Sequence, residues 1–161
     1  MFRDTDIPLA ESAYTKALTI QDSLVSDFPA TPFYRQELAN SLNNLGILLQ
    51  SSGNNKGAES AFDRSMGIRD KLAKDVPWVP DIRKDLAAGL NNRGIQLQVQ
   101  NRLKEAEPLY LKALEDLRAL TKEFPDSIEY NLELSRTLLN ESVLLESLGK
   151  NKDADKVSSQ S

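Results

Sequence analysis

The sequence predicts an all-α protein built from repeated pairs of antiparallel helices, and three motifs that share one interval are the reason. Each motif recurs after 48 residues. A fixed interval shared by separate motifs is the mark of a repeat array. The first motif is SLNNLG at 41–46, GLNNRG at 89–94 and TLLNES at 137–142. The second is AESAYTKAL at 10–18, AESAFDRSM at 58–66 and AEPLYLKAL at 106–114, and the third is Pro29, Pro77 and Pro125.

Apolar residues within each repeat fall three and four positions apart, which is the period of one face of an α-helix. In the first repeat they are Tyr34, Leu38, Leu42, Leu45 and Leu49, and the next two repeats follow the same pattern. The alternation typical of a half-buried strand is absent. Leu, Ala, Glu and Lys are frequent, and these residues favour helix.

Proline, glycine and asparagine mark the expected helix ends. Thr31-Pro32 has the form of an N-cap followed by proline in the first helical turn, and Ser127 is a candidate N-cap. Turns are expected to begin at Gly53, Asn101 and Gly149. We therefore expect six long helices and a short seventh that begins near residue 152. The long helices are predicted at 8–27, 32–51, 56–75, 80–99, 104–123 and 128–148.

These repeats resemble the tetratricopeptide repeat (TPR), whose 34-residue pattern combines apolar positions with a small residue at position 8 and an aromatic residue at position 24. With Gly46 at position 8, Ala58 and Phe62 fall on the alanine and aromatic positions, and Gly94 and Tyr110 match in the next repeat. The resemblance implies a right-handed superhelix of antiparallel helix pairs. In such a fold the small residues let helices approach closely, and the aromatic residues fill the space between neighbouring repeats.

The interval of 48 residues exceeds 34, so each helix should be longer than in the usual TPR. This form resembles the TPRs of kinesin light chains and the tandem TPRs of some bacterial signalling proteins. The predicted organisation is one array over 1–161, with a second helix of a partial unit at 8–27, full units at 32–75 and 80–123, and a degenerate, truncated unit at 128–161. In the last unit, Glu141-Ser142 replaces Leu-Gly and Ser158 replaces the aromatic residue. We expect the chain to be a fragment of a larger protein, with open ends that favour self-association.

The resemblance also places certain positions of each first helix on a concave face that would hold a partner. The predicted peptide-binding residues are Asn40, Asn43, Asn44, Ile47 and Gln50 in the first repeat, Asn91, Asn92, Ile95 and Gln98 in the second, and Arg136, Asn140 and Val143 in the third.

Two rows stand out among these residues. Asn44, Asn92 and Asn140 form a row of primary amides, which both donate and accept hydrogen bonds and so suit the backbone of an extended peptide. Ile47, Ile95 and Val143 form an apolar row beside it. A structural alternative stays open, in which the asparagine pairs 43–44 and 91–92 cap or bridge adjacent helices.

Composition excludes several kinds of chemistry. The chain contains no Cys and no His, which removes disulfides, thiolate ligands and the commonest general base. Its seven glycines are scattered and form no phosphate-binding loop. We therefore expect no enzymatic activity, no cofactor and no metal. A net charge of −4 disfavours nucleic acid. The sequence has neither a membrane-spanning stretch nor the apolar core of a signal peptide, so we expect a cytoplasmic protein with no membrane partner.

The expected function is a scaffold that binds an extended peptide or a partner protein in the concave groove. Because Arg136 is the only basic residue among the predicted groove residues, a clamp for the terminal carboxylates of chaperones is disfavoured. Two alternatives remain. The repeats could form a structural, self-assembling array, or they could be a regulatory segment of a multidomain bacterial signalling protein, such as a serine/threonine kinase, whose catalytic part is not in this chain.

Overall fold

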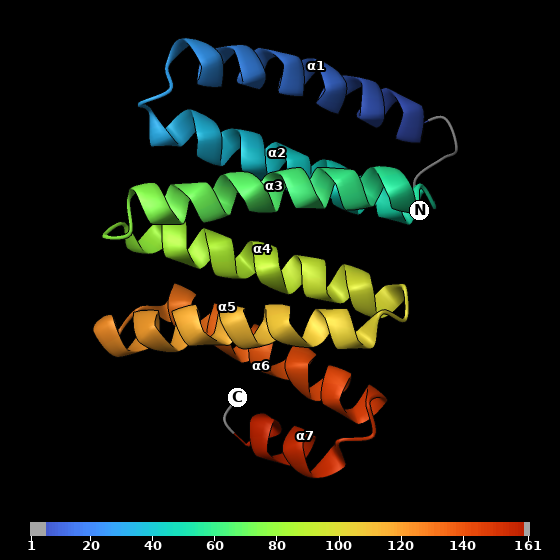
Figure 1. The fold of residues 1–161 in the computed structure, drawn as a ribbon, viewed down its shortest axis with the longest axis vertical. Helices are drawn as coiled ribbons and strands as arrows, with labels where there is room; N and C mark the ends of the chain where they lie inside the picture. Colours follow the sequence, from blue (N-terminus) through green and yellow to red (C-terminus); the bar gives the residue numbers. More distant parts are fainter. Residues whose placement is uncertain (1–5, 160–161) are drawn as a thin grey trace. The chain divides into compact units, whose positions relative to one another are not determined.

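The computed structural model describes residues 6–159, and its ordered elements are all α-helices (Figure 1). They are α1 (Asp6–Asp27), α2 (Pro32–Ser51), α3 (Asn55–Asp75), α4 (Pro80–Val99), α5 (Leu103–Glu123), α6 (Ile128–Ser147) and α7 (Asn151–Ser158). The all-α prediction is confirmed, and every predicted helix end lies within two residues of the observed one. The signal-peptide argument rests partly on residues 1–5, which lie outside the described range, as do residues 160–161 of the predicted last unit.

The chain divides into two compact units, Met1–Val76 and Pro77–Ser161. In the first unit, α2 packs against both α1 and α3. In the second unit, α5 packs against α4 and α6, α6 also contacts α4, and α7 packs against α6. A single array over 1–161 and a right-handed superhelix stay predictions.

The turn after each first helix is the same motif at an interval of 48 residues. Gly53, Asn101 and Gly149 have φ angles of 82°, 59° and 74°, in the left-handed region. One residue further on, a backbone N–H reaches back to a carbonyl of the helix: Asn54 to Leu49, Arg102 to Leu97 and Lys150 to Leu145, each at 2.8 Å. This is the Schellman arrangement, which satisfies carbonyls that a helix end leaves unpaired.

The starts of the helices match the sequence less well. Pro32 and Pro80 stand at the first position of α2 and α4, as their fixed φ angle favours. Thr31 is the N-cap of α2, as predicted, although its side chain makes no hydrogen bond to the helix. Ser127 does cap α6, because its hydroxyl oxygen accepts a hydrogen bond from the Tyr130 N–H at 3.4 Å.

Glycine lies against an aromatic ring in two of the helix pairs. A Cβ atom on Gly46 would lie 2.9 Å from Phe62 Cε1, and one on Gly94 would lie 2.7 Å from Tyr110 Cζ. Phe62 packs inside its own pair, whereas Tyr110 shares a buried cluster with Leu144 of the following helix α6. The aromatic residues thus fill space within a pair as well as beside the next repeat.

The third pair replaces this large-on-small contact with two small residues. The hydroxyl groups of Ser142 on α6 and Ser158 on α7 form a hydrogen bond of 2.6 Å. The substitution of serine at both positions keeps the surfaces complementary, so the degenerate unit still packs.

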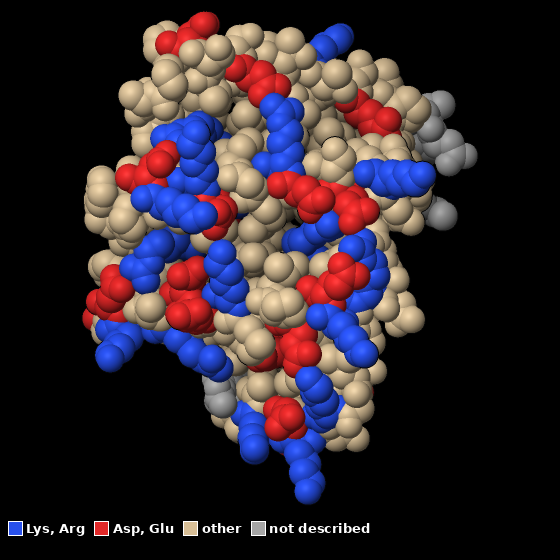
Figure 2. All heavy atoms as spheres, in the orientation of Figure 1, with Lys and Arg blue, Asp and Glu red and all other residues tan. Residues whose placement is uncertain are grey.

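Ion pairs between the two helices of a pair also repeat. Arg35 at the start of α2 pairs with Asp75 at the end of α3 at 2.5 Å, and Arg83 of α4 pairs with Glu123 of α5 at 2.9 Å. On the face drawn in Figure 2, positive and negative side chains are interspersed. Pairs with one well-exposed partner contribute only about 0–1 kcal/mol each, so apolar packing dominates the stability.

No helix between residues 6 and 159 is both long enough and apolar enough to cross a bilayer. The same part of the chain holds no group of three or more acidic side chains arranged to bind a metal ion.

Candidate functional site

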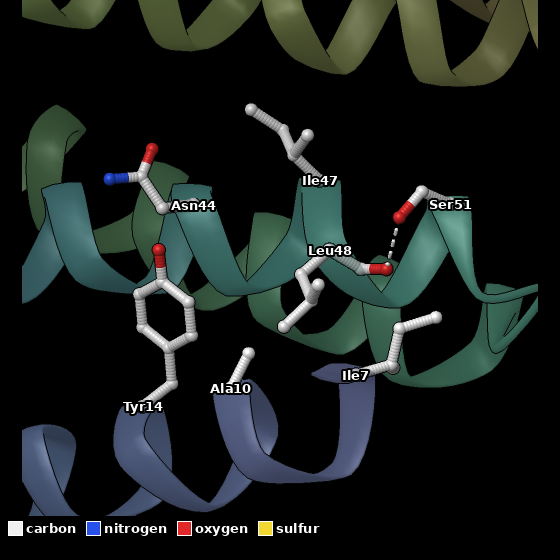
Figure 3. Close-up of a pocket in the computed structure, with 7 residues that line it drawn as sticks. All are labelled: Ile7, Ala10, Tyr14, Asn44, Ile47, Leu48 and Ser51. Atoms are coloured by element: carbon white, nitrogen blue, oxygen red, sulfur yellow. Dashed lines mark hydrogen bonds between the residues drawn. The ribbon is translucent and has the colours of Figure 1, made fainter. Parts of the chain in front are cut away.

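Each unit contains a pocket that is lined by residues predicted to bind a partner. The pocket of the first unit has a volume of about 430 Å³ and lies between α1 and α2 (Figure 3). Leu48 of α2 and Ala10 of α1 point toward each other across it. Its lining residues are Ile7, Ala10 and Tyr14 of α1 and Asn44, Ile47, Leu48 and Ser51 of α2.

The pocket of the second unit has a volume of about 530 Å³. It lies where α4, the start of α5 and α6 meet. Its lining residues are Ile95, Gln98 and Val99 of α4, Asn101 of the turn, Leu103 of α5, and Asn140, Val143 and Ser147 of α6.

Half of the predicted binding residues line one of these pockets. They are Asn44, Ile47, Ile95, Gln98, Asn140 and Val143. Of the others, Gln50 and Asn92 are half-buried and line neither pocket. Arg136 is exposed and pairs with Glu133 of its own helix at 2.5 Å.

Two predicted contacts are not available to a peptide in this structure. Asn91 is 0% exposed and Asn43 is 8% exposed, because both side chains face the protein interior, whereas Leu139 at the same position of α6 is 52% exposed. The Asn91 side chain instead accepts a hydrogen bond from Asn140 Nδ2 at 2.9 Å, which joins α4 to α6. For Asn91 the structural alternative is therefore the correct one.

Asn40 also takes part in an internal network. Its Oδ1 accepts a hydrogen bond of 2.8 Å from Arg69, whose Nε lies 3.4 Å from Ser65 Oγ, and Ser65 in turn donates to the Ala39 carbonyl at 2.7 Å. Arg69 and Ser65 are both buried. The network joins α2 to α3 and provides hydrogen-bond partners for a buried guanidinium group.

Asn140 keeps an open acceptor, although its amide nitrogen is engaged. Within the described residues its Oδ1 has no partner, and the side chain lines the pocket of the second unit. Asn44 is exposed at the corresponding position of the first unit. Both amides can therefore meet a ligand through at least one polar atom.

A hydrogen bond from Tyr110 of α5 holds the Gln98 side chain in place. Its Oε1 accepts a hydrogen bond from the Tyr110 hydroxyl at 2.5 Å. Burial raises the pKa of the Tyr110 hydroxyl far above its ordinary value, so the hydroxyl stays protonated and remains a donor. This hydrogen bond fixes the orientation of the Gln98 side-chain amide.

Among the residues that the structure describes, none that lines either pocket carries a charge. Such a surface suits uncharged apolar groups, since a charge placed there would lose water without gaining a counter-ion. Sequence reasoning missed the residues of the second helices, namely Ile7, Ala10, Tyr14 and Leu103, because it followed the first helices alone. The available signal was the apolar residue at the start of the second helices, because Ile7 and Leu103 are two repeat intervals apart in the sequence.

A family model described as "Tetratricopeptide repeat" matches residues 38–74, which run from α2 to α3. None of the curated proteins compared with the chain matches it. A solved structure, the crystal structure of BtubC (BKLC) from P. vanneervenii, aligns over 98% of this chain and 90% of that chain with 13% identity and a TM-score of 0.35. The kinesin-light-chain-like form of the repeat stays a prediction. The family match identifies a tetratricopeptide repeat over α2 and α3, and the glycine-on-aromatic contact of this helix pair recurs in α4 and α5.

Proposed function

We propose that this chain is a protein-interaction module that binds an extended segment of a partner along its first helices, α2, α4 and α6. TPRs are a non-catalytic fold for protein interaction, which supports the general role. The observation that carries the finer proposal is the pair of charge-free pockets, each lined by an asparagine of the predicted amide row and an aliphatic residue beside it.

The two interpretations of the asparagines both contribute to this proposal. Asn91 holds α4 to α6, and in doing so it fixes the amide plane of Asn140. Fixing a side chain before binding lowers the entropy that the ligand must overcome. Asn140 Oδ1 is then a preorganised acceptor for a backbone N–H of the partner, while exposed Asn44 can donate or accept.

The test begins with peptides selected from a random phage-displayed library on the immobilised chain. The affinity of each selected peptide is then measured for the wild type and for an Asn44→Ala/Asn140→Ala variant. Loss of one ligand hydrogen bond costs roughly 0.5–1.5 kcal/mol, so we expect a loss of about 5- to 100-fold for the pair. Asn151→Ala removes an exposed amide that lines neither pocket and is the matched control.

Unchanged affinity of all selected peptides for the double variant, with helicity intact, would refute the groove. A loss of helicity in the double variant but not in the control would instead assign Asn44 and Asn140 a structural role. Circular dichroism at 222 nm separates these two results.

We further infer a cytoplasmic setting within a bacterial signalling protein, which rests on the resemblance described above. A net charge of −4 supports a protein partner over nucleic acid. Fusion of the chain to a fluorescent protein, followed by fractionation of the parent organism, tests the compartment.

Self-assembly is the second candidate, and one surface favours it. Ile128, Leu132 and Leu139 of α6 are 76%, 65% and 52% exposed and fall on one side of the helix. Exposed apolar stripes of this kind often serve as interfaces. Sedimentation equilibrium of the wild type and of a Leu132→Asp/Leu139→Asp variant tests this candidate. If the chain assembles through this stripe, the wild type is an oligomer and the variant dissociates. A monomeric wild type excludes self-assembly.

A further inference from the structure

We infer that the two pockets are copies of one side-chain site, and that each of them accepts a large, uncharged apolar side chain of a partner segment. This inference rests on the proposed function, because it specifies the chemistry of the segment that the groove holds. It adds a ligand class and a number of anchor points.

Four lining residues of the first pocket have counterparts in the second. Ile7 and Leu103 stand at the start of a second helix, and they are two repeat intervals apart in the sequence. The same separation joins three more pairs that line the pockets. These pairs are Asn44 with Asn140, Ile47 with Val143, and Ser51 with Ser147. The two pockets therefore share two aliphatic residues, one asparagine and one serine in the same order.

The hydroxyl groups indicate which polar groups a ligand must bring. Ser51 donates to the Leu48 carbonyl at 2.7 Å, and Ser147 donates to the Val143 carbonyl at 2.8 Å. Their hydrogens are engaged inside the helix, so each serine oxygen offers only acceptor capacity. Asn140 Oδ1 is likewise an acceptor, because its nitrogen donates to Asn91. The pocket of the second unit thus offers acceptors at Asn140 and Ser147 beside the amide nitrogen of Gln98, a donor, so its polar groups suit both the N–H and the carbonyl of a peptide backbone.

The described lining residues of both pockets carry no charge, and this favours an uncharged side chain on the ligand. An ammonium or carboxylate group would be partly desolvated there without an opposite charge, which is unfavourable. An aliphatic or aromatic side chain loses no such hydration and buries its surface against Ile47 or Val143. The volumes, about 430 and 530 Å³, lie at the lower end of the range of roughly 300–1,000 Å³ typical of small-ligand sites. They suit one side chain with its flanking backbone amides.

Methyl NMR with single-residue probes tests this directly. The probes are the N-acetyl, N-methylamide derivatives of leucine, aspartate and lysine, which share a backbone and differ in the side chain. We expect the leucine probe to shift the methyl signals of Ile7 and Ile47 and those of Leu103 and Val143, with saturation in roughly the millimolar range. The aspartate and lysine probes should leave these signals in place.

Each pocket supplies the control for the other. Ser147→Leu fills the second pocket, so it should abolish the shifts at Leu103 and Val143 and keep those at Ile7 and Ile47. Ser51→Leu should give the reverse. Both serines are exposed on their helices, so the leucine side chains do not disturb the buried core.

Three results overturn the inference: no shift in either pocket, a shift in one pocket only, or equal shifts with the charged probes. None of these depends on the amide variant used with the selected peptides. If a peptide binds in a manner that requires Asn44 and Asn140 while the leucine probe leaves the pockets unperturbed, the proposed function stands and this inference fails.

Discussion

Replacement of Gly46 by alanine probes the contact that sets how closely α2 and α3 approach. The new Cβ would lie 2.9 Å from two atoms of the Phe62 ring, whereas ordinary carbon contacts begin near 3.4 Å. The ring is 2% exposed and has little room to move. Overpacking of this kind costs roughly 1–3 kcal/mol, and alanine recovers about 1 kcal/mol of helix propensity over glycine. We therefore expect a net loss of about 0–2 kcal/mol in the free energy of unfolding.

Gly67 of α3 is the matched control within the same unit. It is exposed, and a Cβ there would have nothing within 4 Å. Gly67→Ala should therefore gain the full propensity term, about 1 kcal/mol. Because propensity is common to both substitutions, the difference between them, about 1–3 kcal/mol, isolates the packing against Phe62.

Urea denaturation followed by circular dichroism at 222 nm measures both variants, with a fit that allows for the two units. A second substitution, Phe62→Leu, removes the ring edge, and the double-mutant cycle should show favourable coupling with Gly46→Ala of about 0.5–3 kcal/mol. If Gly46→Ala stabilises the protein as much as Gly67→Ala does, the close approach of the helices does not depend on glycine and the reasoning is wrong.

Three further predictions concern the second unit. Gly149→Ala places a Cβ at a φ of 74° and should lower stability by roughly 1–2 kcal/mol in urea denaturation, whereas Asn101→Gly should not lower it. Burial raises the pKa of Glu141, with Arg118 opposing and Glu107 adding, so its folded-state pKa exceeds the unfolded value. Between these two pKa values the folded state holds more protons than the unfolded state, so this group makes stability rise as the pH falls from 7 toward its ordinary pKa of 4.5. Glu141→Gln should therefore raise stability at pH 7 and flatten that rise in pH-dependent unfolding curves. Arg83→Ala breaks the pair with Glu123, which is largely solvent-exposed, and should change the urea midpoint by less than the equivalent of about 1 kcal/mol.

The helix ends were predictable because local chemistry determines them. Pro32 and Pro80 favour the first turn of a helix, and Gly53, Asn101 and Gly149 are the residues that most readily adopt the left-handed angle of a Schellman turn. Thr31 is the N-cap of α2 without a side-chain hydrogen bond. Proline at the first position already favours the helix start, so no side-chain cap is required there.

The site was predictable only in part, because neighbouring helices decide which polar residues are covered. Position 5 and position 6 of a first helix are both asparagine in two repeats, so the sequence alone does not separate them. The contact from Asn140 to Asn91 separates them, and it joins residues 49 positions apart. The walls that Ile7 and Leu103 add were missed for the same reason, since they lie on the second helices.

The central claim is that a partner segment lies along the first helices, and methyl NMR of the chain with a selected peptide tests it most directly. The account predicts shifts at Ile47 and Val143, with weaker binding when the apolar side chain of the peptide is replaced by aspartate. Leu111 of α5 is exposed and lines neither pocket. Shifts concentrated at Leu111, with Ile47 and Val143 unperturbed, would contradict the account.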